Sequence, residues 1–357
     1  MRSAHPRIVI VAASLDLLGG HGVQAISLIG ALAREGLPVT FLPINPVFPP
    51  GLRWIRGWPY LRTLVNQALY LPSLLRLRHA DVVHVFSASY ASFLLAPMPA
   101  MLMGRLLRRR VILHYHSGEA ADHLARWGVF VHPWLKLADE IVVPSQYLAN
   151  IFAAHGHATR VIPNIVSLTS FRYRDRSPLR PRLLSIRNLE PYYRVDVVLE
   201  AFARLKERLP EATLTVAGCG SEEARLKQMA TPGVRFVGRV EPADMPSLFE
   251  FSDVFVNASV VDNQPVSILE AFAAGLPVVS TPTGDISALV RHGQTGLLIP
   301  ENDPDTLAAA VLALIERPLE ALEFARAARR EVSRFTWAAV RSCWLDVYGG
   351  AEVSSVQ

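Results

Sequence analysis

Short apolar segments alternate with helix-like segments along the whole chain, and this alternation constrains the fold more than any other feature. Each apolar segment is five to seven residues long, a length typical of strands. The candidates are residues 7–13, 39–45, 81–87, 110–116, 140–145 and 160–164 in the first half and 182–188, 212–218, 234–238, 253–259, 277–281 and 296–300 in the second. Strands that alternate with helices predict parallel sheets, so we expect an α/β fold of two doubly wound, Rossmann-like domains.

The chain has 357 residues, of which 51% are hydrophobic and 19% charged, and this size suits two globular domains. Residues 167–182 are polar, basic and interrupted by proline, which is typical of a linker. We therefore expect a first domain over residues 1–175 and a second over 176–334. Ligands of such sheets bind beyond the carboxyl ends of the strands, so the expected site is an interdomain cleft.

The N-terminal sequence MRSAHPRIVIVAAS lacks the long apolar core of a signal peptide. Cys219 and Cys343 are far apart in the sequence and provide neither a disulfide framework nor a metal-ligand spacing. Residues 82–104 carry no Asp, Glu, Lys or Arg, but two prolines in their middle argue against a membrane-spanning helix. We expect a cytoplasmic protein.

Positive charge is concentrated at the start of the chain. Residues 1–118 carry 12 Lys and Arg against 3 Asp and Glu, whereas residues 119–357 carry 24 against 28. Within the basic part, residues 53–78 combine five arginines with two tryptophans and two tyrosines. This combination suits a protein bound peripherally to the anionic inner face of a membrane. The alternative is a basic protein surface that is exposed only to solvent, which would have the same composition. No recognition motif accompanies the charge, so we expect no nucleic-acid partner.

The segment DNQPVSILEAFAAG, residues 262–275, predicts a loop that turns into a buried helix. Pro265 suits the first helical turn, and Gly275 suits the position after the last. Apolar residues face almost every direction around this helix, which is typical of a buried one. Glu270 is then a buried carboxylate that needs a polar partner, unless it lies on a solvated helix face. Asp262, the helix N-terminus and Glu270 could together hold a polar, anionic ligand.

The segment after the first apolar run is rich in glycine, and Gly20, Gly22 and Ala25 match the pattern G-x-G-x-x-A. This pattern occurs in dinucleotide-binding folds. The glycines lie several residues after the expected strand, however, and no acidic residue ends the second strand, where a ribose-binding carboxylate belongs. The same glycines would also suit an anion-binding loop in front of a helix or a plain turn.

With these features the chain resembles glycosyltransferase family 4, whose members are retaining enzymes of GT-B architecture, and the resemblance covers essentially the whole length. Its strongest part is residues 258–304. Family members carry an acidic residue, seven residues and then Glu, followed by A-x-A-x-G-x-P-V-V and later by G-x-T-G-L-L. Asp262, Glu270, AFAAGLPVV and GQTGLL stand at these positions. Residues 335–357 resemble the family's last helix, which returns to the N-terminal domain.

The resemblance implies an acceptor-side N-terminal domain and a nucleotide-sugar-binding C-terminal domain. Glu270 would hold the ribose hydroxyls of a nucleoside diphosphate sugar, and Asp262, where many members have Glu, would contact the donor sugar. The loop and helix start that would face the diphosphate and sugar are Asn263, Gln264, Pro265, Val266 and Ser267. The glycine-rich segment would add donor contacts from Gly19, Gly20 and Gly22.

Residues 183–202 resemble the family's donor-phosphate segment, whose usual pattern is Arg, then Lys, Gly and a V-D-x-L run. Arg187 stands at the Arg position, and alignment on the V-D pair puts Tyr193 at the Lys position and Arg194 at the Gly position. Arg194 would then supply the second cation, because guanidinium binds phosphate well. Without it the departing diphosphate has one cation and turnover is weak.

His114 and His116 end an expected strand, and alternation puts them on the same face. Family members carry a His at the end of this strand, close to the donor sugar, and His116 lies nearer to that end. The catalytic residues implied by the resemblance are therefore His116, Arg187 and Asp262.

The resemblance implies a retaining, hexosyltransferase-like enzyme that moves a sugar from a nucleoside diphosphate sugar to an acceptor hydroxyl, with no metal or other cofactor. The acceptor would be lipid-linked or part of a polysaccharide, or else a soluble small molecule. A non-catalytic nucleotide-sugar-binding relative would carry many of the same motifs. A dehydrogenase, an epimerase or a phosphorylase on a similar architecture is also compatible with the fold alone.

Overall fold

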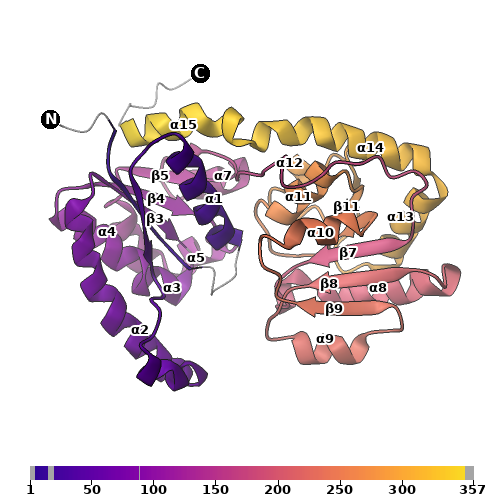
Figure 1. Ribbon diagram of the computed structural model, residues 1–357, viewed down its shortest axis with the longest axis horizontal. Helices are drawn as coiled ribbons and strands as arrows, with labels where there is room; N and C mark the ends of the chain where they lie inside the picture. The colour runs from indigo at the N-terminus through magenta and orange to yellow at the C-terminus, as the bar shows by residue number, and fades with distance from the viewer. Residues whose placement is uncertain (1–4, 15–19, 88, 350–357) are drawn as a thin grey trace. The chain divides into compact units, whose positions relative to one another are not determined.

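The structure, a computed structural model, describes residues 5–14, 20–87 and 89–349. The chain divides into two compact units. Unit 1 is Met1–Pro163 with Val340–Gln357, and unit 2 is Asn164–Ala339. Each unit contains a six-stranded parallel sheet with helices around it (Figure 1). The expected class, two doubly wound α/β domains, is confirmed.

The sheet of unit 1 has the strand order β2-β1-β3-β4-β5-β6. Its strands are β1 (Ile8–Ala12), β2 (Val39–Pro43), β3 (Val82–Ser87), β4 (Arg110–Tyr115), β5 (Glu140–Val143) and β6 (Arg160–Val161). Every residue of β1 and β3 is buried, as expected for a parallel sheet that is covered on both faces. The strand order reverses between β1 and β3, so the topological switch point lies at their carboxyl ends.

Unit 1 also contains eight α-helices and two 3₁₀ helices in its described part. These are α1 (Gly20–Arg34), α2 (Pro59–Ser73), α3 (Tyr90–Leu95), α4 (Pro97–Leu106), α5 (Ala120–Arg126), α6 (Gly128–Leu135), α7 (Gln146–Ala154), α15 (Trp337–Gly349), η1 (Pro50–Gly57) and η2 (Leu74–His79). The last helix, α15, starts at the end of unit 2 and buries Val340, Trp344, Val347 and Tyr348. None of the helices in the described ranges is long and apolar enough to cross a bilayer.

The sheet of unit 2 has the strand order β12-β11-β10-β7-β8-β9. Its strands are β7 (Arg182–Ile186), β8 (Thr213–Ala217), β9 (Val234–Gly238), β10 (Val254–Val256), β11 (Val278–Ser280) and β12 (Leu297–Leu298). The order reverses between β7 and β10, which pair in parallel. The switch point of this unit therefore lies at the carboxyl ends of β7 and β10.

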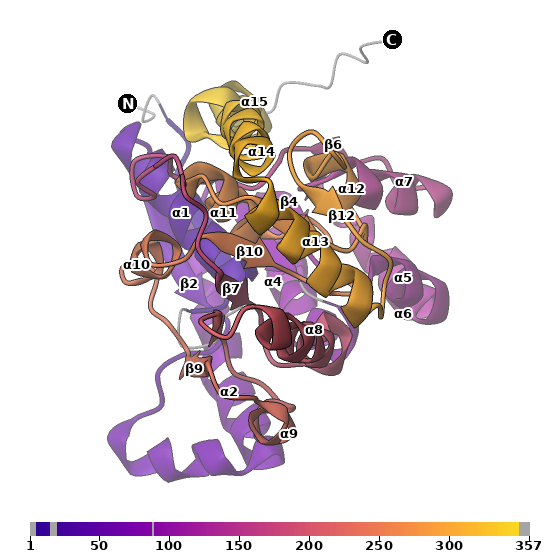
Figure 2. The same cartoon turned by 90° about the vertical axis from the view of Figure 1, so that its right-hand side faces the viewer.

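Two hydrophobic clusters cover the faces of the unit 2 sheet. The helices are α8 (Val195–Arg208), α9 (Glu223–Met229), α10 (Met245–Glu250), α11 (Val266–Ala274), α12 (Ile286–Leu289), α13 (Pro304–Glu316), α14 (Pro318–Glu331), η3 (Pro191–Tyr193) and η4 (Val332–Phe335). Helices α8 and α13 pack side by side in one cluster (Figure 2). The other cluster contains α11, which is buried at most positions.

Each of the twelve segments expected to form a strand contains one. The helix expected after residue 262 is also present, although it begins at Val266, so that Pro265 precedes its first turn instead of lying in it. Gly275 follows this helix with φ 79°, a left-handed conformation that favours glycine. A Cβ there would also lie 2.7 Å from the ring of Tyr173.

The segment 167–182, expected to be a linker, is packed within unit 2. Arg176 is 3% exposed and donates hydrogen bonds to the carbonyl oxygens of Phe249 (2.7 Å), Ser252 (2.9 Å) and Ala274 (2.6 Å). Burial lowers its pKa to about 10, so it remains charged at neutral pH. Composition alone did not reveal this role, because a buried arginine is rare unless backbone acceptors surround it.

Replacing Arg176 with Met should lower the free energy of unfolding by about 3 kcal/mol or more, because three buried carbonyls lose their donor. Urea unfolding measures the change. The exposed Arg172→Met in the same segment serves as the control and should stay within about 0.5 kcal/mol of the wild type. Equal effects of the two substitutions would contradict the assigned role.

Candidate functional site

The switch point of unit 2 holds a largely buried ion pair between Arg187 and Asp262. Arg187 follows β7 directly, and its Nη2 lies 2.8 Å from Oδ2 of Asp262, with side-chain exposures of 9% and 10%. The Nε of Arg187 donates to Oδ1 of Asn257, which follows β10, at 2.8 Å. The two neighbouring strands therefore bring these three residues together at the carboxyl edge, where a ligand of such a sheet binds.

Asp262 is fixed by contacts on both oxygens. The Ser259 hydroxyl donates to Oδ2 at 3.1 Å, and the Asn263 backbone N–H donates to Oδ1 at 2.9 Å. Gly284 packs against the Asp262 backbone, since a Cβ at Gly284 would lie 2.1 Å from the Asp262 carbonyl oxygen. These contacts hold the Asp262 carboxylate toward Arg187.

The segment after Arg187 places a second arginine in an unusual backbone conformation. Arg194, at the family's Gly position, has φ 49° and ψ 44° immediately before α8. Its guanidinium donates to both carboxylate oxygens of Asp196, at 3.0 and 3.2 Å. Tyr193, at the family's Lys position, lies with its ring 5.4 Å from the Arg187 guanidinium. The second cation expected from Arg194 is therefore engaged with Asp196 in this structure.

The start of α11 combines helix amides with a polar side chain that lacks a partner. No side chain caps this helix. The Oγ of Ser267, in its first turn, is buried without a hydrogen-bond partner within the described residues. Gln264 serves the fold, because its side chain accepts from Asn164 N–H at 2.7 Å and donates to Asp285 at 3.2 Å. The Ser267 hydroxyl and the helix N-terminus are suited to an anion.

Glu270 lies in the second turn of α11, surrounded by the apolar residues of the helix. Burial raises its pKa to about 8. The side chain has no hydrogen bond or ion pair to any residue that the structure describes, although the residue keeps some exposed surface. A carboxyl group in this state is suited to accept hydroxyl donors from a ligand, since these would satisfy its ionised form.

Two glycines that the sequence analysis did not single out lie at the same edge. Gly218 and Gly220 follow β8, and a Cβ there would come within 1.8 Å of the Arg187 carbonyl oxygen and 2.3 Å of the Leu189 carbonyl oxygen. The Leu189 N–H also donates to the Cys219 carbonyl at 3.0 Å. The signal in the sequence was the AGCG run, residues 217–220, at the end of an expected strand.

The candidate residues of unit 1 lie at the ends of other elements. Gly20 and Gly22 form the first turn of α1 rather than a loop, and Gly19 lies outside the described residues. His116 follows β4, where its backbone N–H donates to the Ser87 carbonyl at 3.3 Å. Its ring stacks on Phe86 with centroids 5.2 Å apart.

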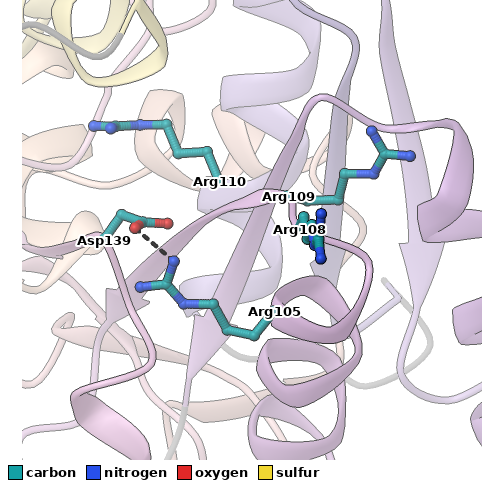
Figure 3. A pocket seen from close by; sticks show the side chains of 5 residues that line it. All are labelled: Arg105, Arg108, Arg109, Arg110 and Asp139. Carbon is teal, nitrogen blue, oxygen red and sulfur yellow. Dashed lines mark ion pairs between the residues drawn. The ribbon is translucent and has the colours of Figure 1, made fainter.

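An open hollow of about 430 Å³ in unit 1 lies away from these residues, at the amino end of β4 (Figure 3). It is lined by Arg105, Arg108, Arg109, Arg110 and Asp139. Arg105 pairs with Asp139 at 2.7 Å, whereas Arg109 and Arg110 point away from one another. We assign no ligand to this hollow, because its guanidinium groups do not converge.

The chain matches two family models that follow each other along the sequence. The model of Glycosyltransferase Family 4 matches residues 18–170, and that of Glycosyl transferases group 1 matches residues 180–317. The chain belongs to glycosyltransferase family 4. The resemblance inferred from the sequence is therefore confirmed.

Two similar proteins carry the names of different enzymes. Glycogen synthase of Mycobacterium tuberculosis is 30% identical over 250 residues, which cover 66% of this chain but only 60% of that protein. Phosphatidyl-myo-inositol mannosyltransferase of Mycobacterium leprae is 26% identical over 278 residues, covering 75% of this chain and 73% of that protein. The match to glycogen synthase thus spans less than two thirds of that relative.

Solved structures show the same fold. HepE of Anabaena, in a structure with UDP and glucose, has a TM-score of 0.75 at 19% identity, covering 97% of this chain and 100% of HepE. Sucrose-phosphate synthase of Thermosynechococcus elongatus has a TM-score of 0.71 at 17% identity, covering 96% and 98%. The expected GT-B fold is confirmed.

Replacing Glu270 with Gln should stabilise the protein at pH 8 and change little near pH 4.5. The folded state holds a proton on Glu270 up to a pKa of about 8, whereas the ordinary value is 4.5. Wild-type stability should therefore fall as pH rises between these values, and the Gln variant should avoid that loss. We expect a gain in Tm of roughly 2–4 °C or more at pH 8.

Thermal unfolding from pH 5 to pH 8 tests this expectation. Glu200→Gln, at an exposed position of α8, is the control and should show no pH-dependent difference from the wild type. A gain in Tm that is the same at pH 5 and pH 8 would contradict the raised pKa.

Proposed function

We propose that this chain is a retaining glycosyltransferase that moves a sugar from a nucleoside diphosphate sugar to an acceptor hydroxyl. The observation that carries the proposal is the buried pair of Arg187 and Asp262 at the switch point of unit 2, just ahead of the N-terminus of α11, in a chain of family 4. Since HepE has been solved with UDP and glucose, a UDP-hexose is the first donor to test.

In this proposal unit 2 binds the donor. Arg187 and the amides at the start of α11 would stabilise negative charge on the departing diphosphate, which is electrostatic catalysis by preorganised groups. These groups would do so without a metal ion. Glu270 would accept the ribose hydroxyls, and Asp262 would contact the sugar. His116, Gly20 and the acceptor site would be contributed by unit 1.

The proposal predicts that one nucleoside diphosphate raises the melting temperature. A ligand at about 100 times its dissociation constant stabilises by roughly 2.7 kcal/mol. UDP, GDP, ADP and NAD should be compared. Arg187→Met should abolish the shift, because the phosphate cation is lost, whereas the exposed Arg180→Met should retain it.

The nucleotide that binds identifies the donor for a transfer assay, and NMR of the product should show the donor's anomeric configuration retained. A shift with NAD alone would contradict the proposal in favour of a dehydrogenase. An inverted anomeric configuration would contradict retention.

A non-catalytic nucleotide-sugar-binding protein is the second candidate. It is favoured by Tyr193 at the family's Lys position and by the engagement of Arg194 with Asp196. A nucleoside diphosphate would raise the melting temperature of such a protein, but the protein would transfer no sugar to lipid, polysaccharide or small-molecule acceptors.

Peripheral association with an anionic membrane is a further part of the proposal. The segment formed by η1, α2 and the residue between them exposes Trp54 (66%), Trp58 (62%), Tyr60 (89%) and Leu64 (66%). Arg53 and Arg62, which are also exposed, lie in the same segment. Aromatic and basic residues that are exposed in one segment suit the headgroup region of anionic lipids, and a lipid-linked acceptor would be reached there.

Binding to vesicles tests this association. The protein should sediment with vesicles of anionic phosphatidylglycerol and less with neutral phosphatidylcholine. Joint replacement of Trp54, Trp58 and Tyr60 by Ala should weaken binding about tenfold or more, since aromatic residues anchor at the interface. Phe130→Ala, at a 63% exposed position of α6, is the control. Equal loss in both variants would contradict the assignment.

A further inference from the structure

Three buried polar side chains of unit 1 form a hydrogen-bonded chain to which the proposed reaction assigns no role. The hydroxyl of Tyr348 on α15 lies 2.8 Å from Nδ1 of His84 on β3. Nε2 of His84 lies 3.2 Å from Nδ1 of His114 on β4. None of the three residues is more than 4% exposed. The chain therefore connects the C-terminal helix to the carboxyl half of β4, next to His116.

Aromatic packing holds these rings in place. Trp344, one turn before Tyr348, lies with its ring 5.3 Å from His84 and 5.1 Å from His114. Phe86 stacks on His84 at 5.0 Å. These neighbouring rings restrict rotation of both imidazoles. The hydrogen bonds of His84 and His114 therefore stay with the partners given above.

The protonation state follows from burial. Burial lowers the pKa of His84 to about 3 and that of His114 well below its usual range, and it raises the pKa of Tyr348. At neutral pH both imidazoles are therefore neutral, each with one donor and one acceptor nitrogen, and the phenol keeps its proton.

The hydroxyl of Tyr348 decides which group donates and which accepts in these hydrogen bonds. If Tyr348 donates to Nδ1 of His84, then His84 carries its proton on Nε2 and donates to Nδ1 of His114. The proton of His114 must then be on Nε2. Each direction leaves one buried donor without an acceptor among the described residues: the His114 Nε2–H in the first arrangement and the Tyr348 O–H in the reverse one. The reverse direction is the more costly, because it leaves the stronger donor, the phenol, unpaired and makes the phenolic oxygen accept in place of an imidazole nitrogen, the better acceptor. The first arrangement is therefore preferred.

We propose that Tyr348, acting through His84, fixes His114 as the tautomer with its proton on Nε2, and that this N–H binds an oxygen of the sugar substrate. The Nε2 atom of His114 is buried without a hydrogen-bond partner in the part of the chain that the structure describes. It lies at the carboxyl end of β4, where its ring centroid is 4.1 Å from that of His116. Tyr348 and His84 are positioning residues in this scheme, which rests on the proposed function.

Selective ¹⁵N labelling of the histidines reads the tautomer without turnover. In the wild type we expect the His114 proton on Nε2, and in Tyr348→Phe a mixture of tautomers. Addition of UDP-glucose should shift the Nε2 resonance in the wild type. In transfer assays Tyr348→Phe should raise the KM of a sugar substrate about fivefold or more, as expected for one lost hydrogen bond, with kcat within about twofold.

Tyr70→Phe is the matched control. Tyr70 is likewise a buried tyrosine of unit 1, and its hydroxyl donates to the Ala96 carbonyl at 2.8 Å. Tyr70→Phe should lower the free energy of unfolding about as much as Tyr348→Phe does. It should change neither the tautomer of His114 nor the KM of the sugar substrate.

Three results would overturn the inference. The first is a wild-type His114 that carries its proton on Nδ1. The second is a KM that Tyr348→Phe leaves unchanged, because the His114 N–H would then bind water and not the substrate. The third is equal KM changes in the two Phe variants. If no sugar is transferred while UDP-glucose still shifts the His114 resonance, the proposed reaction fails and this inference stands.

Discussion

The largely buried ion pair between Arg187 and Asp262 places a strong demand on its surroundings in unit 2. Moving two charges out of water costs several kcal/mol for each ion, and mutual attraction offsets this only if the remaining polar atoms are also satisfied. Asn257, Ser259 and the Asn263 amide supply those bonds. All of these residues follow β7 or β10, so the pair requires the two strands to be neighbours and both loops to stay in place.

The same demand explains where glycine is needed. The loop after β8 approaches the backbone at Arg187 so closely that Gly218 has no room for a Cβ, and Gly284 approaches Asp262 in the same way. Three neighbouring strands, β10, β7 and β8, therefore deliver their loops to one place. This is the geometry that the reversal of strand order produces in doubly wound sheets.

The fold was predictable from the sequence because its signals are local. Apolar runs in the sequence predicted all twelve strands, and Gly275 predicted the end of α11. Contacts that depend on distant segments were not predictable. Examples are the carbonyl oxygens around Arg176 and the bond between His84 and Tyr348, which are 264 residues apart. The engagement of Arg194 was also missed, because it follows from a left-handed backbone that a position in an alignment does not reveal.

The contacts of Asp196 have a further consequence for the ligand binding that is proposed for unit 2. Arg194 reaches this carboxylate from the turn before α8, and Arg225 reaches it from α9 with a separation of 3.7 Å. The side chain of Asp196 thereby links the segment that follows β7 to the segment that follows β8. Immobilising a mobile side chain on binding costs about 0.5–1.5 kcal/mol, and loops that are already cross-linked avoid this cost. The binding proposed at this edge should therefore need little ordering of these two connections, and its association rate should be limited by diffusion and orientation.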